Sequence, residues 1–299
     1  MTQPREILST ISADKHVLIA GPTASGKSAL AIALAQGQGG VIVNADALQV
    51  WSCWRIISAR PSIQDEAEAR HLLYGHMQPG APYSVGQWLD QVAEILSGGE
   101  RLIVVGGTGL YLHALSNGLA VIPPVPDDIR AEGNAIIASP DGMSRMVAAL
   151  DPRTHQRIDL RNPARVQRAW EVLRATGRGI ADWQAETGPA LIPPAASERI
   201  VLNSDRDWLA ERIDRRFRLM MQQGALEEVR EMLPHWEPTA LWARAIGAPE
   251  LVAYLSGDMS LDEAVERAII ASRQYAKSQR IFFRGRMKDW RQIPIGPAA

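Results

Sequence analysis

The chain has 299 residues, of which 46% are hydrophobic and 22% are charged, and its formal net charge is −1. This composition is typical of a globular protein with a large core, and it excludes a protein that binds nucleic acid through a global basic field, so any such site must be a local patch. Cys53 is the only cysteine, which excludes an internal disulfide framework and a thiolate metal site.

The N-terminal residues 1–16 have no apolar stretch of the kind found in signal peptides. The chain also has no run of about eighteen apolar residues. We therefore expect a cytoplasmic protein that has no membrane partner, and we expect it to be a monomer.

The first predicted element is a buried strand at residues 17–20, and helix formers follow at 29–34. Between them lies Gly21-Pro-Thr-Ala-Ser-Gly26-Lys27-Ser28, a complete G-x-x-x-x-G-K-[ST] motif in its usual strand–turn–helix context. Its glycines let the backbone wrap around an oxyanion, and the helix start adds N–H donors. The alternative is an ordinary glycine turn before a helix. We predict a di- or triphosphate site at Gly21, Thr23, Ala24, Ser25, Gly26, Lys27 and Ser28, with the Ser28 hydroxyl on Mg²⁺.

Strands and helices alternate in the next hundred residues. Strands are predicted at 41–43 and 101–105, a one-faced helix at 84–96, and an irregular segment at 49–61. Such alternation favours right-handed βαβ units and a parallel sheet. The predicted fold class is therefore α/β, with a P-loop core whose sheet is flanked by helices.

Two proline pairs, at 123–124 and 193–194, enclose a region with helical patterns and no β-branched strand-like run. Proline pairs cannot continue a helix and suit the boundaries between modules. We predict an all-helical insertion at residues 123–194, which divides the core into residues 1–122 and 195–299.

In the second part of the core, residues 199–202 predict a strand that rejoins the sheet. Long amphipathic helices are predicted at 208–233, where Gly224 eases the helix, and at 261–283. The tail from Gln292 is predicted to be loose.

Polar residues follow the predicted strands, at the edge where open α/β sheets bind ligands. Asp46 follows the second strand, where it can act as a base or simply cap a turn. Thr108 follows the third strand, where it can contact a ligand or cap the next helix. The third strand ends in Gly-Gly-Thr instead of the aspartate that helps hold Mg²⁺ in typical P-loop nucleoside triphosphatases, which argues against an ordinary ATPase or GTPase.

The ordered set of motifs resembles the bacterial tRNA dimethylallyltransferases, also called tRNA isopentenyltransferases, over most of the chain. The matching stretches are Gly21 to Ser28, Asp46-Ala-Leu-Gln49-Val-Trp51, His71-Leu-Leu, Pro82-Tyr-Ser-Val-Gly-Gln-Trp88, Gly106 to Tyr111, Arg165-Val-Gln-Arg168-Ala-Trp-Glu171, Met221-Gln-Gln-Gly224-Ala-Leu-Glu-Glu228, Arg244-Ala-Ile-Gly247 and Arg273-Gln-Tyr-Ala-Lys277-Ser-Gln279.

The resemblance implies transfer of a dimethylallyl group from dimethylallyl diphosphate to N6 of the adenosine just 3′ of the anticodon of tRNA, with Mg²⁺ as cofactor. The phosphate loop would then hold a diphosphate leaving group, and no nucleoside triphosphate would be needed. The resemblance implies that Asp46 takes the proton of the adenine amine and that Thr108 and Arg244 also contact the diphosphate. The predicted catalytic residues are Asp46, Thr108, Lys27 and Arg244.

Two local stretches are basic enough to contact tRNA phosphates. Residues 273–288 carry six basic residues and no acid, and residues 161–178 carry five arginines and Glu171. Such stretches are often solvated helix faces, but within this resemblance tRNA contact is the better interpretation for at least one of them. The helical insertion resembles the part that grips the anticodon stem-loop. The acceptor base is expected to flip out of its stack. The predicted tRNA contacts are Asp46, Gln49, Arg165, Arg168, Arg273, Lys277 and Gln279.

Several positions depart from the family pattern, and they fall in the acceptor-side loops. Cys53 and Ile57 replace glycines, Ala47 replaces a serine, Ala248 a tyrosine and Ser278 an arginine. The alternatives are a small-molecule kinase, prenyl transfer to a free adenine nucleotide, and an RNA-binding module without catalysis.

Overall fold

The structure is a computed structural model that describes residues 7–296. It divides the chain into two compact units, one formed by the residues up to Ser116 and from Leu191 onward, and the other by Asn117–Ala190. Each unit has its own buried core. In the described residues, no helix combines the length and the apolar character needed to cross a membrane.

The larger unit is built on a six-stranded, fully parallel sheet in the order β3-β2-β4-β1-β5-β6. Its strands are β1 His16–Ala20, β2 Val41–Asn44, β3 His71–Leu72, β4 Leu102–Gly106, β5 Ser197–Ser204 and β6 Arg291–Ile295. Strand β1 lies between β4 and β5, with Val17 opposite Ile103 and Leu18 opposite Arg199. The segments that leave the carboxyl ends of β1, β2 and β4 therefore emerge at one edge of the sheet.

The helices and 3₁₀ turns of this unit connect or cover the strands. They are α2 Lys27–Gln38, α3 Ile63–Glu68, α4 Val85–Ser97, α5 Gly109–Asn117, η1 Pro194–Ala196, α11 Arg206–Gln222, α12 Ala225–Met232, η2 Leu233–His235, η3 Trp242–Arg244, α13 Ala248–Leu255 and α14 Leu261–Arg286.

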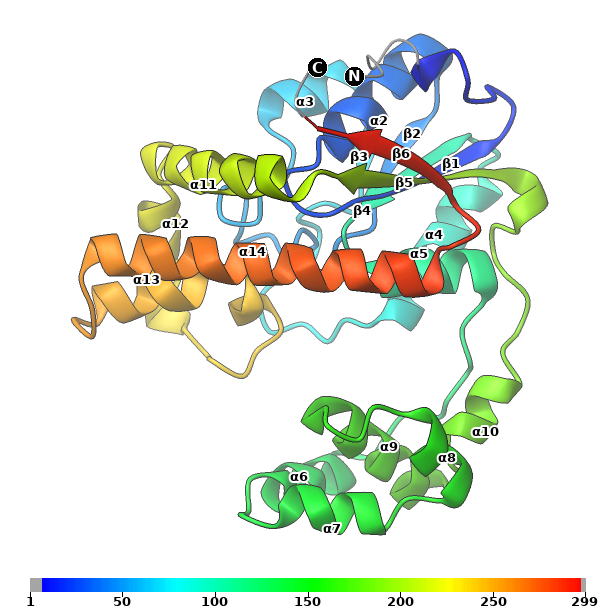
Figure 1. Ribbon diagram of the computed structural model, residues 1–299, viewed down its shortest axis with the longest axis vertical. Helices are drawn as coiled ribbons and strands as arrows, with labels where there is room; N and C mark the ends of the chain where they lie inside the picture. The colour runs from blue at the N-terminus through cyan, green and yellow to red at the C-terminus, as the bar shows by residue number, and fades with distance from the viewer. Residues whose placement is uncertain (1–6, 297–299) are drawn as a thin grey trace. The chain divides into compact units, whose positions relative to one another are not determined.

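Alternate side chains of each strand point to opposite faces of the sheet, and both faces are covered. Ile19 of β1 belongs to a buried cluster with Leu34 of α2. Leu18, its neighbour, belongs to the cluster on the other face with Trp88 of α4 and Leu112 of α5. Figure 1 shows α2 above the sheet and α5 below it. The predicted α/β fold is confirmed.

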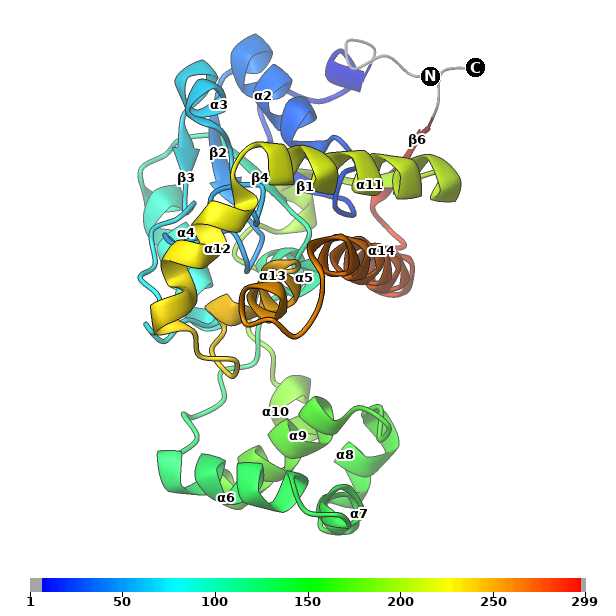
Figure 2. The same ribbon diagram turned by 90° about the vertical axis from the view of Figure 1, so that its left-hand side faces the viewer.

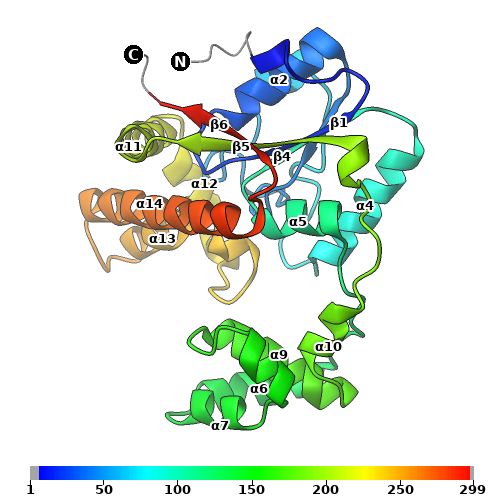
Figure 3. The same ribbon diagram turned by 45° about the vertical axis from the view of Figure 1, so that its right-hand side comes forward.

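Three helices from the second half of the chain complete this unit. Helices α11 and α14 lie side by side (Figures 1 and 2), and α13 packs along the N-terminal half of α14 (Figure 3). Because α11 directly follows β5, the neighbour of β1, this helix pair lies beside the segment that connects β1 to α2.

The smaller unit is entirely helical in the part of the chain that the structure describes. Its helices are α6 Asp127–Ile137, α7 Gly142–Ala148, α8 Pro152–Arg157, α9 Pro163–Thr176 and α10 Ile180–Ala185. The core is formed around α9, where Val166 and Trp170 are buried with Met146 of α7. The unit spans 117–190, whereas the sequence predicted 123–194.

Two sequence predictions are corrected by the structure. The predicted helix at 208–233 is two helices, α11 and α12, because Gly224 has a φ of 101° that a helix cannot contain. The tail from Gln292 is not loose, because residues 291–295 form edge strand β6 beside β5. Pro294 is compatible with such an edge position. The short strand β3 and helix α13 were not predicted.

Candidate active site

The segment at residues 21–28, called here the 21–28 turn, connects β1 to α2. Ala24 (φ 61°) and Gly26 (φ 90°) adopt the left-handed conformation that curls successive backbone N–H groups toward a common point. Gly26 is the N-cap of α2 and supplies no side-chain cap, so the helix start keeps donors for an anion. The Ser25 hydroxyl is buried and has no hydrogen-bond partner among the described residues.

Helices α11 and α14 hold this turn from outside. Arg212 donates from Nε to the Ala24 carbonyl (2.8 Å), and Arg216 donates to the Thr23 hydroxyl (3.2 Å). The Thr23 N–H donates to Oε1 of Gln279 on α14 (3.0 Å). The conformation of the turn therefore depends on side chains that follow it by about two hundred residues or more.

Gln279 has a role inside the unit that the sequence did not predict, and its tRNA contact stays a prediction. Only 5% of its surface is exposed, and its Nε2 donates to the Gly107 carbonyl (2.9 Å) while its Oε1 accepts from Thr23. Both ends of the amide are therefore used inside the unit, where they connect the 21–28 turn to the segment after β4.

Lys27 and Arg216 are two cations whose charged forms are disfavoured by burial more than they are favoured by the nearby Asp46 carboxylate. The pKa of Lys27 is lowered to about 8, because the effect of burial, to which the nearby Arg216 adds, outweighs the opposing charge of the Asp46 carboxylate. Burial likewise lowers the pKa of Arg216 to about 10, again against the effect of Asp46. A bound polyanion would favour the charged form of both side chains.

The segments after β2 and β4 are joined at Asp46 and Thr108. The Thr108 hydroxyl accepts a hydrogen bond from the Ala47 N–H (2.9 Å), and the Thr108 N–H donates to the Ala45 carbonyl (3.1 Å). The Thr108 hydroxyl therefore connects the segment that follows β4 to the segment that follows β2. A Cβ on Gly106 would lie 2.0 Å from the Ala45 oxygen, so this close approach requires glycine.

Asp46 is both a turn former and an available acid group. Its Oδ1 accepts from the Leu48 N–H (3.0 Å), which is the turn cap that the sequence allowed. Its Oδ2 faces the backbone of Gly107, where an added Cβ would lie 3.2 Å away. The cap occupies one oxygen, so the carboxylate can still accept a proton.

Tyr275 is a site residue that the sequence did not reveal. Its side chain hydrogen-bonds with those of Thr108 and Gln279, and burial, followed by the charge of Asp46, raises its pKa above the usual value. Tyr275 and Gln279 are four residues apart on α14 and therefore lie on one face of that helix. This spacing was the signal that could have identified the pair.

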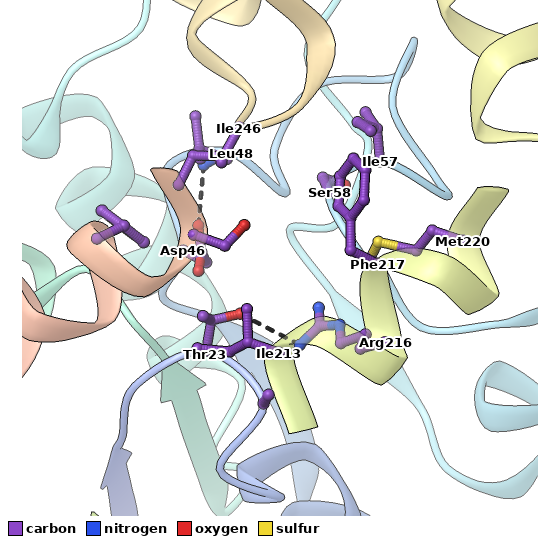
Figure 4. A pocket seen from close by; sticks show the side chains of 13 residues that line it. Thr23, Asp46, Leu48, Ile57, Ser58, Ile213, Arg216, Phe217, Met220 and Ile246 are labelled. Carbon is purple, nitrogen blue, oxygen red and sulfur yellow. Dashed lines mark hydrogen bonds between the residues drawn. The ribbon is translucent and has the colours of Figure 1, made fainter. Parts of the chain in front are cut away.

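One pocket brings together the 21–28 turn, Asp46 and α11 (Figure 4). It contains about 560 Å³ of empty space, including its opening to solvent. Its polar lining comes from Thr23, Asp46, Ser58, Arg216, Ser272 and Tyr275. Its apolar lining comes from Ala24, Leu48, Ile57, Ile213, Phe217, Met220 and Ile246. The pocket thus places the anion-binding turn, the Asp46 carboxylate and an apolar wall side by side.

A second hollow lies on the outer side of the turn, between Lys27, Ser28 and three arginines of α11, Arg212, Arg215 and Arg216. The arginines were not predicted, although their spacing along an amphipathic helix places them on one side. The Ser28 hydroxyl is exposed at the start of α2. The described residues contain no cluster of three or more His, Cys, Asp or Glu side chains that could bind a metal ion. A cation here would therefore need most of its ligands from a bound substrate and water.

Other predicted site residues lie apart from this pocket. Arg244, on η3, is exposed and does not line it, so its diphosphate contact stays a prediction. Gln49 donates from Nε2 to the carbonyls of Ser58 (2.9 Å) and Ala59 (2.7 Å). Its tRNA contact also stays a prediction.

Apart from Gln279, the predicted tRNA contacts on helices are exposed. In the smaller unit, Arg165 and Arg168 lie on α9, and neither forms an ion pair with a described residue. In the larger unit, Arg273 and Lys277 belong to a groove between α11 and α14. Further basic side chains line this groove, which is named here the α11–α14 groove: Arg206, Arg280 and Arg284.

Comparisons with known proteins give a consistent result. The family model described as IPP transferase matches residues 49–286. The chain is 65% identical to a tRNA dimethylallyltransferase of Paracoccus denitrificans, over 99% of this chain and 100% of that protein. It is 62% identical to a tRNA dimethylallyltransferase of Cereibacter sphaeroides, over 95% of this chain and 98% of that protein.

Solved structures show the same fold. A eukaryotic dimethylallyltransferase described as acting on tRNA has a TM-score of 0.78 and 26% identity, over 94% of this chain and 74% of that one. A tRNA isopentenylpyrophosphate transferase from Bacillus halodurans has a TM-score of 0.66 and 28% identity, over 96% of this chain and 91% of that one.

Proposed function

The chain belongs to the IPP transferase family, and on this premise we propose that it transfers a dimethylallyl group from dimethylallyl diphosphate to tRNA. The acceptor atom is N6 of the adenosine on the 3′ side of the anticodon, and diphosphate is released. The observation that carries the proposal is the single pocket in which the 21–28 turn, Arg216 and Asp46 meet beside an apolar wall.

At the donor end, the turn and two cations receive the diphosphate. Backbone N–H groups of the turn, Lys27 and Arg216 stabilise the negative charge that grows on the diphosphate as the allylic C–O bond breaks and its electron pair leaves with oxygen. Burial lowers the pKa values of Lys27 and Arg216 more than the charge of Asp46 raises them, and the diphosphate would add the negative charge that favours their protonated forms. Binding is therefore strongest for the state with the most negative charge on the leaving group.

At the acceptor end, Asp46 receives the proton. The N6 lone pair forms the new N–C bond to the allylic carbon, and the amine proton moves to the Asp46 carboxylate. Such general-base catalysis typically contributes about 10²–10⁴-fold. Thr108 and Tyr275 hold the segment that carries Asp46, because the Thr108 hydroxyl accepts from Ala47 and Tyr275 hydrogen-bonds with Thr108.

We include Mg²⁺ in the proposal, held by the Ser28 hydroxyl and by oxygens of the diphosphate. The exposed position of Ser28 beside Lys27 and the lack of an acidic cluster in the described residues fit a metal ion that arrives with the substrate. When bound, the ion supplies positive charge to the leaving group.

The tRNA is bound by basic side chains whose charge is not neutralised inside the protein. In the α11–α14 groove, Arg273 and Lys277 form no ion pair with a described residue. Arg165 and Arg168 of the smaller unit add contacts to the anticodon stem-loop. The acceptor base leaves its stack to reach Asp46. The protein acts as a monomer.

The test is an incubation of the protein with dimethylallyl diphosphate, Mg²⁺ and unmodified tRNA, followed by mass spectrometry of the nucleosides. We expect N6-dimethylallyladenosine and one diphosphate per modified base. ATP turnover without prenylation would instead favour a kinase, and modification of free adenine nucleotides but not tRNA would change the acceptor.

A further inference from the structure

The loop at residues 54–60, called here the 54–60 loop, is held by a carboxylate from another helix. Glu228 of α12 accepts hydrogen bonds from three successive backbone N–H groups, those of Arg55 (2.6 Å), Ile56 (3.0 Å) and Ile57 (2.8 Å). Hydrogen bonds to a charged acceptor are stronger than neutral ones. The position of Ile57 is therefore fixed by a residue 171 positions later in the chain.

The other side of the same loop is held as well. Gln49 donates to the carbonyls of Ser58 (2.9 Å) and Ala59 (2.7 Å), and the Ser58 hydroxyl donates to the Trp54 carbonyl (2.7 Å). With its N–H groups bonded to Glu228 and its carbonyls bonded to Gln49, the loop has little freedom to retreat from the pocket.

The side chain of Ile57 fills space at the edge of the pocket that a glycine at this position would leave open. Its side chain is only 5% exposed and lines the pocket, at a position where the family pattern described above has glycine. A Cβ placed on Gly247 would lie 2.9 Å from Cδ1 of Ile57 and 2.6 Å from Cε2 of Phe217. The tip of Ile57 and the ring of Phe217 therefore both press against the Gly247 backbone.

The apolar wall begins beside the cation that receives the diphosphate. Ile213, Phe217 and Met220 flank Arg216 on α11 at helical spacing, and all four line the pocket. Figure 4 shows Ile57, Phe217 and Met220 gathered on one side of the pocket and Asp46 on the other. A donor whose diphosphate lies at Arg216 places its hydrocarbon chain along this side, and the adenine must approach from the side of Asp46.

We propose that Ile57 closes the prenyl compartment and restricts the donor to a five-carbon chain, and that Glu228 is the positioning residue that holds Ile57 there. This inference rests on the proposed function and adds the length limit of its donor. A ten-carbon geranyl chain would meet Ile57 before its diphosphate reached the turn, whereas a smaller residue at 57 would open space beyond Phe217.

The experiment compares kcat/KM for geranyl diphosphate and dimethylallyl diphosphate in the full-length protein, with tRNA and Mg²⁺. We expect Ile57→Ala to raise the geranyl-to-dimethylallyl ratio by about ten-fold or more, as expected when steric exclusion of several methylenes is relieved. Ile57→Val, which removes one methyl group and keeps the β-branch, should raise it less and serves if the alanine variant does not fold. An unchanged ratio in folded variants would overturn the proposal, as would wild-type protein that uses both donors equally.

Two further comparisons localise the effect. Met220→Ala removes bulk from the same side but from α11; if it raises the ratio while Ile57→Ala does not, the limit lies on α11 and our assignment is wrong. Glu228→Gln should also raise the ratio, because its amide nitrogen cannot accept from the loop N–H groups. Its matched control is Glu227→Gln on the same helix, whose exposed side chain forms an ion pair with Arg230 and does not hydrogen-bond with the 54–60 loop, and we expect no change.

The ratio separates a positioning role of Glu228 from a merely structural one, since general destabilisation would lower both kcat/KM values together. If the wild type modifies tRNA with dimethylallyl diphosphate and the ratio does not move, the length limit fails alone. If the wild type modifies tRNA with neither donor, the proposed function fails, and this inference fails with it.

Discussion

The two walls of the pocket are built in different ways. The 21–28 turn is one uninterrupted motif, and its left-handed residues and helix start come from eight consecutive positions. The 54–60 loop has no such motif, and its shape depends on Glu228 and Gln49. The comparison shows that the 21–28 turn can be identified from a contiguous motif, although Arg212, Arg216 and Gln279 also support it, whereas the position of the 54–60 loop is set by contacts with distant residues that no motif announces.

The largest effect is expected at Asp46, which belongs to neither wall. Asp46→Asn keeps the size of the side chain and an oxygen that can cap the turn, but it removes the base. We expect turnover to fall by about 10²–10⁴-fold while tRNA and donor still bind, as measured by single-turnover kinetics and filter binding. Normal turnover in this variant would remove Asp46 from the proton transfer.

The next effect belongs to the 21–28 turn and its cations. Lys27→Met or Arg216→Gln removes one charged donor to the diphosphate, so kcat/KM for the donor should fall roughly 10- to 100-fold, from about 1.5–3 kcal/mol for a hydrogen bond to a charged group. KM for tRNA should stay the same. Arg230→Gln, on the exposed face of α12, is the control. If these variants lost as much affinity for tRNA as for the donor, the assignment of Lys27 and Arg216 to the donor side of the pocket would be contradicted.

Gln279 tests whether the 21–28 turn is as local as its motif indicates. Gln279→Ala leaves the Thr23 N–H and the Gly107 carbonyl without their partner, and we expect a loss of about 2 kcal/mol in the free energy of unfolding, given about 1–3 kcal/mol for each buried group left unpaired. Urea denaturation measures it, with exposed Gln274→Ala of the same helix as control. A loss no larger than the control's would show that the motif holds its shape alone.

The smallest effect is expected at His16, on strand β1 of the sheet, and it concerns the pH dependence of stability. Nδ1 of His16 accepts from the Leu102 N–H (3.0 Å), and burial, followed by the charge of Arg101, lowers the pKa of His16. Because this pKa is lower in the folded protein than in the unfolded chain, the stability it contributes is present above about pH 6.5 and is lost as the pH falls below that value.

His16→Asn keeps an acceptor near this position but cannot be protonated. The free energy of unfolding of the variant should therefore depend less on pH between 7 and 5 than that of the wild type. Chemical denaturation at several pH values measures the difference. Identical pH profiles for the two proteins would show that His16 does not titrate with folding.

The sequence alone predicted the α/β fold and the residues that follow its strands, because these signals are local. Lys27 and Thr108 lie in contiguous motifs that appear in strand–turn–helix order. Arg216 was not predicted as a site residue, because arginines on an amphipathic helix are usually solvated. Only the packing of α11 against the 21–28 turn gives Arg216 its role.

Two further features that the sequence did not reveal have the same physical origin. Gln279 lies in a basic stretch and was predicted to contact tRNA, which stays a prediction; its hydrogen bonds inside the unit, on a face of α14 that points inward, were not predicted. Residues 291–295 have weak strand character of their own, and they become β6 only because β5 offers an unpaired edge. Strand pairing depends on partners that are distant in sequence, and the four-residue spacing of Tyr275 and Gln279 places them on one face of α14 without revealing what that face packs against.

The left-handed backbone of Gly224 has a consequence for the dimensions of the pocket. This residue joins α11, which carries Arg216, to α12, which carries Glu228 and through it sets the place of Ile57. The chain changes direction at Gly224, between the end of α11 and the start of α12. The backbone conformation of Gly224 therefore contributes, from outside the pocket, to the distance between Arg216 and Ile57, which both line it.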